Sequence, residues 1–275
     1  MLVAPLWDSN ACQFVGLLTV TDCIDVLLQR PQSGASPIGA VFRRPSHFGG
    51  IDAGCTLMQA CRHLLALQAN PFVPIVYAED MRCLACITYT NILEFLVLQF
   101  REQRRLFDDS IRDLNIGTYT DLVTVYPDQT IAEALQVMQQ HHRAAVPVID
   151  RATKKVVGMY SRADCTFLVQ GGNRNPREQQ HQQQQQPPPS GETAAMTDFS
   201  LTIEHVLAQQ HPSVTTPDAL RTCSPNHTLQ AIFESFAAMR FNRLCVVDEA
   251  EQLVGIVSAR DLVAYFLCDE DVTSS

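Results

Sequence analysis

Four short segments of the chain repeat one pair of side chains that could cap a helix or bind a ligand. In each segment a serine or threonine stands three residues before an aspartate or asparagine, between two apolar stretches: Thr19 and Asp22, Thr88 and Asn91, Ser161 and Asp164, and Ser258 and Asp261. A single pair of this kind is most simply interpreted as a capping box at the start of a helix. Its recurrence along the sequence indicates an array of one small module, with function located between the modules.

The groups available at such a turn also suit a nucleotide. A helix N-terminus offers free N–H groups and partial positive charge, which favour a phosphate. An aspartate in the first turn can accept hydrogen bonds from the two adjacent hydroxyls of a ribose, and the preceding strand can lie against the base. The elements therefore fit an adenine nucleotide, and the cap and the ligand site are compatible interpretations.

Phosphate binding also calls for cationic side chains near these turns. Arginine can match phosphate oxygens with two hydrogen bonds, which lysine cannot. The sequence offers several candidates close to the repeated turns: Arg243, the run His141-His142-Arg143, Arg162 and Arg260. The second turn has Asn91 in place of an aspartate, and its strand begins at Pro71 and Phe72 without a basic residue. We therefore expect this site to be weak or empty.

An amphipathic helix and a strand are expected before each of the last three turns. Residues 57–68, 131–142 and 229–241 place apolar side chains at positions i, i+3, i+4 and i+7, and each stretch follows a threonine suited to an N-cap. In the first of them the apolar stripe is Leu57, Ala60, Cys61 and Leu64. Strands are expected at 72–77, 144–150 and 244–248. The module is thus helix–strand–turn–strand–helix, an α+β unit that needs a sibling to cover its apolar faces.

These elements divide the chain into four repeats and one insertion. Repeat 1 is partial, because it supplies a second strand region and a last helix but no preceding amphipathic helix. Either another chain covers the apolar surface that this leaves, or the sequence is a truncated product. The insertion contains a glutamine and proline tract that has almost nothing to bury, so we expect a disordered linker. The boundaries are 1–30 for repeat 1, 41–105 for repeat 2, 111–170 for repeat 3, 171–198 for the linker and 199–270 for repeat 4.

Composition argues against several classes of protein. A net charge of -9 at pH 7 does not suit a general nucleic-acid or membrane-surface binder. No apolar run approaches the roughly 18 residues needed to span a bilayer, and the first residues lack the basic start of a signal peptide, so we expect a cytosolic or nuclear protein. The ten cysteines sit singly in apolar surroundings, as reduced core residues do. Alternation within a strand explains Cys83-x-x-Cys86 better than a zinc site, which needs four ligands.

The repeats resemble cystathionine-β-synthase (CBS) domains, pairs of which form Bateman modules, and the chain more narrowly resembles the γ regulatory subunit of AMP-activated protein kinase. The segments that carry this resemblance are 4–8, 14–22, 91–96, 114–119, 146–150 and 243–248. It covers nearly the whole chain apart from the linker. It implies a disc of four CBS repeats that binds AMP, ADP or ATP in central clefts, with no catalysis and no cofactor beyond these regulatory ligands. It also implies catalytic α and scaffolding β kinase subunits as partners.

The resemblance carries the family's nucleotide positions onto this sequence. They are Leu17, Leu18, Thr19, Val20, Thr21, Asp22, Thr118, Val123, Arg143, Ala144, Ser161, Arg162, Ala163, Asp164, Asn242, Arg243, Ser258, Ala259, Arg260 and Asp261. The ribose role would fall to Asp22, Asp164 and Asp261. Contacts to phosphate or base would come from Thr118, Ser161, Ser258 and Arg243.

The sequence departs from the family at some of these places. Asn242 stands where the family usually has a histidine, and the family arginine near the start aligns with Leu2 or is missing. Basic residues of the second repeat are replaced by Pro71, Phe72 and Thr90. Loss of one charge-assisted hydrogen bond costs about 1.5–3 kcal/mol. We therefore expect nucleotide binding between repeats 3 and 4, and weakened or lost binding between repeats 1 and 2.

Two functions fit these observations. The first is a regulatory subunit that senses adenine nucleotides within a kinase heterotrimer. The alternative is a scaffold of CBS repeats that assembles kinase partners while its nucleotide sites have decayed. A metabolic enzyme carrying CBS domains is disfavoured, because the repeats and linker occupy the chain and no glycine-rich phosphate loop or nucleophile–base pair lies outside them.

Overall fold

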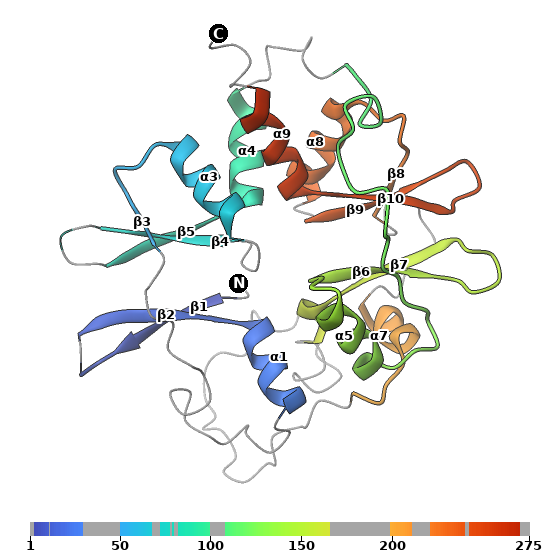
Figure 1. Cartoon of the computed structure of the whole chain (residues 1–275), viewed down its shortest axis with the longest axis horizontal. Helices are drawn as coiled ribbons and strands as arrows, with labels where there is room; N and C mark the ends of the chain where they lie inside the picture. Colours follow the sequence, from blue (N-terminus) through green and yellow to red (C-terminus); the bar gives the residue numbers. More distant parts are fainter. Residues whose placement is uncertain are drawn as a thin grey trace, which may run out of the picture.

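The computed structural model describes residues 3–10, 12–29, 50–67, 72–77, 79, 82–99, 108–165, 199–210, 221–239 and 242–269. Within these ranges the chain forms an α+β array of repeats, one in each quadrant of the view in Figure 1. The linker expected at 171–198, together with Leu2 and Pro71, lies outside the described residues.

Each repeat contains an antiparallel hairpin of two strands. Repeat 1 pairs β1 (Val3–Asp8) with β2 (Gln13–Thr19), where the sequence had predicted only one strand region. The other hairpins are β4 (Phe72–Val76) with β5 (Cys83–Thr88), β6 (Ala145–Ile149) with β7 (Val156–Ser161), and β9 (Arg243–Val247) with β10 (Leu253–Ser258). β-Branched residues make up most of β4 and β6, as the packing of a pleated sheet favours.

A short parallel strand extends the hairpin in repeats 2 and 4. β3 (Ile51–Asp52) pairs with β4, and β8 (Thr222–Cys223) pairs with β9. Repeat 3 has a single parallel bridge between Val125 and Val148 at the corresponding place. The sheets therefore share one plan, which supports their origin as copies of one module.

The helices that open the repeats follow the predicted apolar stripes. They are α3 (Leu57–Ala66), α5 (Ile131–Gln140) and α8 (Leu229–Met239). The predicted N-caps at Thr56 and Thr130 are confirmed, and both form capping boxes; the Thr228 hydroxyl accepts a hydrogen bond from the Ala231 N–H at 3.3 Å. Most residues of the stripes are buried. Leu57 is an exception at 38% exposed, because the first turn of α3 lies at the surface.

The closing helices differ among the repeats. Repeats 1, 2 and 4 close with α1 (Val20–Gln29), α4 (Tyr89–Gln99) and α9 (Ala259–Asp269). Repeat 3 closes with the short 3₁₀ helix η3 (Arg162–Cys165) within the described residues. The predicted order of helix, strand, turn, strand and helix is confirmed in full for repeats 2 and 4.

Two hydrophobic clusters hold the array together. The larger cluster joins repeats 2 and 4 through α3, α4, α8 and α9, which lie together in Figure 1. The smaller cluster joins the helix and strands of repeat 3 to Ile24 of α1 in repeat 1. Helix packing therefore pairs repeat 2 with repeat 4 and repeat 1 with repeat 3.

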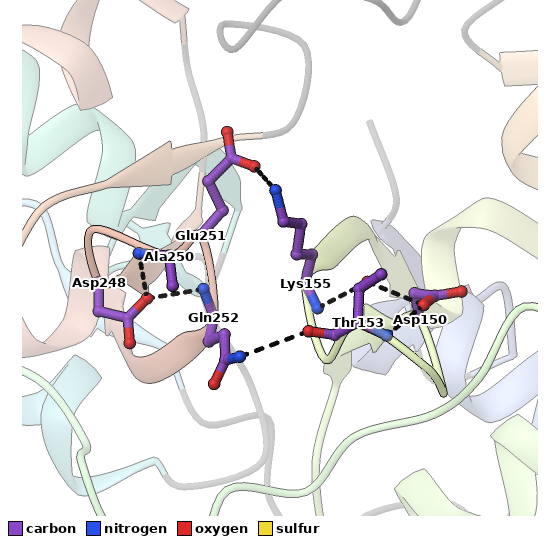
Figure 2. A network of polar contacts seen from close by, with 7 residues as sticks. All are labelled: Asp150, Thr153, Lys155, Asp248, Ala250, Glu251 and Gln252. Carbon is purple, nitrogen blue, oxygen red and sulfur yellow. Dashed lines mark hydrogen bonds and ion pairs between the residues drawn. The ribbon is translucent and has the colours of Figure 1, made fainter.

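The hairpins of repeats 3 and 4 meet along their turns. Lys155 Nζ lies 2.6 Å from Glu251 Oε2, and the Gln252 amide donates to the Thr153 carbonyl at 3.4 Å (Figure 2). Asp150 and Asp248 each accept backbone N–H groups of their own turn, which fixes the two loops that face each other. Contacts between hairpins thus complement the contacts between helices.

The segment at the start of repeat 3 pairs with repeat 4, and the segment at the start of repeat 4 pairs with repeat 3. Residues 109–112 pair with the start of α8, since the Leu229 N–H donates to the Asp109 carbonyl and the Ile111 N–H donates to the His227 carbonyl. Residues 199–204 pair with the start of α5 through Leu201, Phe199 and Ile203. Helix α7 (Ile203–Gln210), which the sequence boundaries assign to repeat 4, packs against β7 and the core of repeat 3.

Candidate functional site

In all four repeated turns the side chain of the aspartate or asparagine accepts the backbone N–H of the serine or threonine three residues before it. Asp261 Oδ2 accepts the Ser258 N–H at 2.8 Å and the Ser258 hydroxyl at 2.7 Å, while the Asp261 N–H donates to Ser258 Oγ at 3.3 Å. The corresponding contacts at Thr19 and Asp22 are 2.8, 2.6 and 3.1 Å. Those at Thr88 and Asn91 are 3.1, 2.7 and 3.3 Å, and Asp164 Oδ2 accepts the Ser161 N–H at 2.6 Å. Each turn is therefore a capped start of a helix.

The cap leaves part of the carboxylate available. At Asp22 and Asp261 the contacts above use Oδ2, and Oδ1 has no hydrogen-bond partner among the described residues. Both side chains are half-buried in the first turn of a helix that follows a strand. A carboxylate held in this way can accept further hydrogen bonds from hydroxyl groups, so the cap does not exclude a ligand.

Thr118 lies beside the turn of repeat 4. Its N–H donates to the Ile256 carbonyl at 2.8 Å, and its carbonyl accepts the Ile256 N–H at 2.9 Å. Ile256 precedes Ser258 by two residues on β10, so Thr118 approaches the same end of the strand. Val123, farther along the same segment, packs against the core of repeat 3 instead.

Charged side chains from repeats 3 and 4 converge near this turn. Burial lowers the pKa of Arg243, the nearby carboxylate of Asp261 opposes that shift, and the charge of Arg143 adds to it. Arg143 and Ala144 are exposed in the turn before β6, whereas Arg243 is half-buried in β9. Two guanidinium groups with one carboxylate leave an excess of positive charge, which suits an anionic ligand.

Two of the predicted arginines have protein partners. Arg162 Nη1 lies 3.0 Å from Asp25 Oδ1 of α1, and Arg260 Nη2 donates to the Leu65 carbonyl of α3 at 2.9 Å. Arg162 thus ties repeat 3 to repeat 1, and Arg260 ties repeat 4 to repeat 2. Nothing in the local sequence pattern relates Asp25 or Leu65 to these arginines, so neither contact could be predicted.

The remaining predicted residues lie at the strand ends and helix starts that form these turns. Leu17, Leu18 and Thr19 end β2, and Val20, Thr21 and Asp22 begin α1. Ser161 ends β7, Ala163 lies in η3, and the Ala144 carbonyl accepts the Arg162 N–H at 3.1 Å. Ala259 is buried at the start of α9. The predicted set therefore divides among the pair of repeats 1 and 3, the meeting of repeats 3 and 4, and the pair of repeats 2 and 4.

Asn242 has a partner from another repeat. Its Oδ1 accepts the Thr90 hydroxyl at 3.2 Å, and its carbonyl accepts the Ala259 N–H at 3.0 Å. Thr90 belongs to the turn that ends in Asn91, so the turn of repeat 2 is linked to the start of β9. A neutral hydrogen bond thus joins two positions at which this sequence lacks the basic residues expected from the family resemblance.

The cysteines are divided between core and surface. Burial raises the pKa of Cys61 to about 11 and the pKa values of Cys223 and Cys245 to about 12, so these thiols stay protonated at neutral pH. Cys12 and Cys55 are exposed, which corrects the expectation that the cysteines lie in apolar surroundings. In the part of the chain that the structure describes, no three His, Cys, Asp or Glu side chains gather as metal ligands. No helix in the same part is long and apolar enough to cross a membrane.

The profile of the CBS domain family matches residues 111–171 and 213–268. Among curated proteins, the chain is 28% identical to the γ subunit of 5'-AMP-activated protein kinase from Dictyostelium discoideum, over 97% of this chain and 45% of that protein. It is 28% identical to the γ-3 subunit from Bos taurus over 94% of this chain and 50% of that protein. The Saccharomyces cerevisiae γ subunit is 25% identical over 96% of this chain and 79% of its own length. The chain thus spans about half the length of the first two relatives.

Solved structures of low sequence identity share the fold. A crystal structure from Methanocaldococcus jannaschii, of a protein proposed as an archaeal homologue of the kinase γ subunit, superposes with a TM-score of 0.67 at 18% identity. That match covers 96% of this chain and 88% of the archaeal chain. A conserved protein from Pyrococcus horikoshii matches with a TM-score of 0.52 at 13% identity, over 97% of this chain and 91% of its own.

Proposed function

Because this chain is a divergent relative of the γ subunits of AMP-activated protein kinase and contains CBS domains, we propose that it is a regulatory subunit of a kinase heterotrimer. It has no catalytic activity of its own. It binds AMP, ADP or ATP between its repeats, and the bound nucleotide adjusts the activity of a catalytic α subunit assembled with a β subunit.

The observation that carries this proposal is the grouping of Arg143, Arg243 and Asp261 at the meeting of repeats 3 and 4. The two arginines would contact the phosphate, and Asp261 would accept the ribose hydroxyls through the carboxylate oxygen that the cap leaves open. Thr118 and Ser258 lie at the same end of β10 and would contact phosphate or base. Asp164 and Asp22 would take the ribose role at the turns of repeats 3 and 1.

One observation favours the alternative scaffold function at repeat 2. There the Thr90 hydroxyl and Asn242 satisfy each other, and Asn91 has no charge to offer. A site of this kind assembles repeats without a ligand. The two functions can coexist in one chain, with nucleotide bound at repeats 3 and 4 and none at repeat 2.

Calorimetry with AMP and ATP, on the chain purified with its kinase partners, tests the proposal. The wild type should bind, and Asp164→Ala and Asp261→Ala should each weaken binding by roughly 1–3 kcal/mol through loss of charged hydrogen bonds. Asn91→Ala serves as the matched control from the second repeat and should change affinity little. If the wild type shows no binding heat and no thermal shift, the scaffold function is favoured. Unchanged affinity in both aspartate variants would contradict the ribose role.

A further inference from the structure

The edge strand of repeat 2 carries two cysteines on one face. β5 is the outer strand in the order β3-β4-β5. In a regular strand, residues three apart point to opposite faces, so alternation alone would separate Cys83 from Cys86. In the structure Cys83 pairs with Val76 and Cys86 pairs with Pro74, with a register shift between them that leaves Leu84 unpaired. Because their partners are two residues apart, this β-bulge puts both thiols on the same face.

The two thiols also interact. Burial raises the pKa of the Cys86 thiol, and the neighbouring Cys83 raises it further through its charge and through a hydrogen bond between the two side chains. Cys83 Sγ additionally donates to the Ala85 carbonyl at 3.6 Å, across the bulge. Neither contact requires a third side chain, so the pair forms a local unit within one strand.

Solvent can reach this strand. Cys83 and Cys86 are half-buried, and Leu84 between them is 56% exposed. Cys223 and Cys245 also lie near each other, but both are buried in the core of repeat 4. Among the described cysteines, Cys83 and Cys86 therefore combine mutual contact with access for a small reagent.

We propose that Cys83 and Cys86 form a reversible disulfide by exchange with a small disulfide such as glutathione disulfide. The Cys83 thiol loses its proton to solvent, and its sulfur attacks the reagent, which forms a mixed disulfide and releases one glutathione thiolate. The Cys86 thiol then loses its proton, and its sulfur attacks Cys83, which forms the protein disulfide and releases a second thiolate. Two protein thiols are oxidised, and one glutathione disulfide is reduced to two thiols.

The assignment of roles follows from position. Cys83 lies at the start of β5, next to the exposed Leu84, and we assign it as the thiol that attacks first. Cys86 is the thiol whose charged form its surroundings disfavour, and so it resolves the mixed disulfide. A disulfide needs Cα atoms within about 7 Å of each other, so oxidation would fix the geometry of the bulge. β5 leads directly into the turn at Thr88 and Asn91, and oxidation therefore acts next to the turn of repeat 2.

Mass spectrometry of the full chain after incubation with glutathione disulfide tests this proposal. The wild type should lose two hydrogens in the peptide that contains both cysteines, and dithiothreitol should restore them. Cys86→Ser should keep a stable glutathione adduct on Cys83, whereas Cys83→Ser should gain far less adduct on Cys86. Cys55→Ser, a variant of an exposed cysteine outside the pair, should form the disulfide like the wild type.

Two results would overturn the proposal. One is a wild type in which Cys83 keeps its glutathione adduct and no disulfide with Cys86 forms. The other is a wild type in which both thiols stay free while the exposed Cys55 becomes modified. Both results are measured on the wild type, so the test remains valid even if a variant folds poorly.

Discussion

Single residues decide how closely repeat 3 approaches repeat 4. A Cβ atom on Gly255 would lie 2.6 Å from Cδ1 of the Tyr119 ring and 3.1 Å from the Thr118 carbonyl oxygen. Gly117 has a φ of +117°, and a Cβ there would lie 2.9 Å from the Ile256 carbonyl oxygen. Both glycines let the segment at 117–119 lie directly on β10, next to the turn proposed to hold the ribose.

We expect Gly255→Ala to destabilise the fold by roughly 1–3 kcal/mol, because a buried methyl group would displace a ring and a backbone carbonyl. Gly158→Ala is the matched control in repeat 3. Its Cβ would meet only the end of the flexible Leu207 side chain, at 2.9 Å, so its cost should be smaller. Urea unfolding of the two variants measures the difference. An equal loss in both would show that contact with Tyr119 does not limit the approach.

At the scale of elements, helices from different repeats are tied by polar contacts next to the capped turns. Arg162 in η3 is paired with Asp25 in α1, and the exposed fractions of the two side chains are 11% and 35%. Arg162 Nε is buried and has no hydrogen-bond partner among the described residues. The carboxylate of Asp25 therefore provides much of the electrostatic stabilisation of the buried guanidinium charge. The ion pair between Lys155 and Glu251 (Figure 2) joins two hairpins and is more exposed. The exposed fractions of its two side chains are 48% and 69%.

Asp25→Ala should therefore destabilise the chain by about 1–3 kcal/mol, below the range for fully buried pairs because Asp25 is one-third exposed. Adding Arg162→Met should recover part of the loss, since the unpaired charge is then removed. Glu251→Gln, as the control, should cost less than about 1 kcal/mol and vary with salt. A double-mutant cycle by urea unfolding gives the coupling energies. A larger coupling for the exposed pair would contradict this ranking.

The sequence predicted the elements better than their contacts. The period of apolar residues located α3, α5 and α8, and threonines marked their first turns, because these signals are local. The partners of Arg162 and Arg260 lie 137 and 195 residues away, and no local pattern identifies them. The exchanged segments before repeats 3 and 4 escaped prediction for the same reason. The bulge in β5 was also missed, because a strand pattern does not show where an extra residue is inserted.

At the scale of the whole molecule, the repeats are unequally stabilised. The larger cluster contains buried residues from both helices and strands of repeats 2 and 4. In the smaller cluster, Ile24 is the buried residue that repeat 1 contributes among those described. Among the described residues, repeat 1 is further held by its own two-stranded hairpin and by the ion pair between Asp25 and Arg162. Local stability should therefore fall from repeat 4 to repeat 1.

Native-state hydrogen exchange on the full chain should reveal this gradient. A two-stranded hairpin with few buried apolar contacts opens locally at a lower free energy than strands embedded in a large core. Backbone amides of β1 and β2 should exchange faster than those of β9, and their exchange should respond little to low concentrations of urea. The amides of β9 should exchange only through a larger, urea-sensitive opening, because Leu244, Cys245 and Val246 are buried in it. The same opening free energy and urea dependence in both hairpins would show that the repeats unfold as one cooperative unit. Repeat 1 would then be held by contacts other than Ile24 and the ion pair.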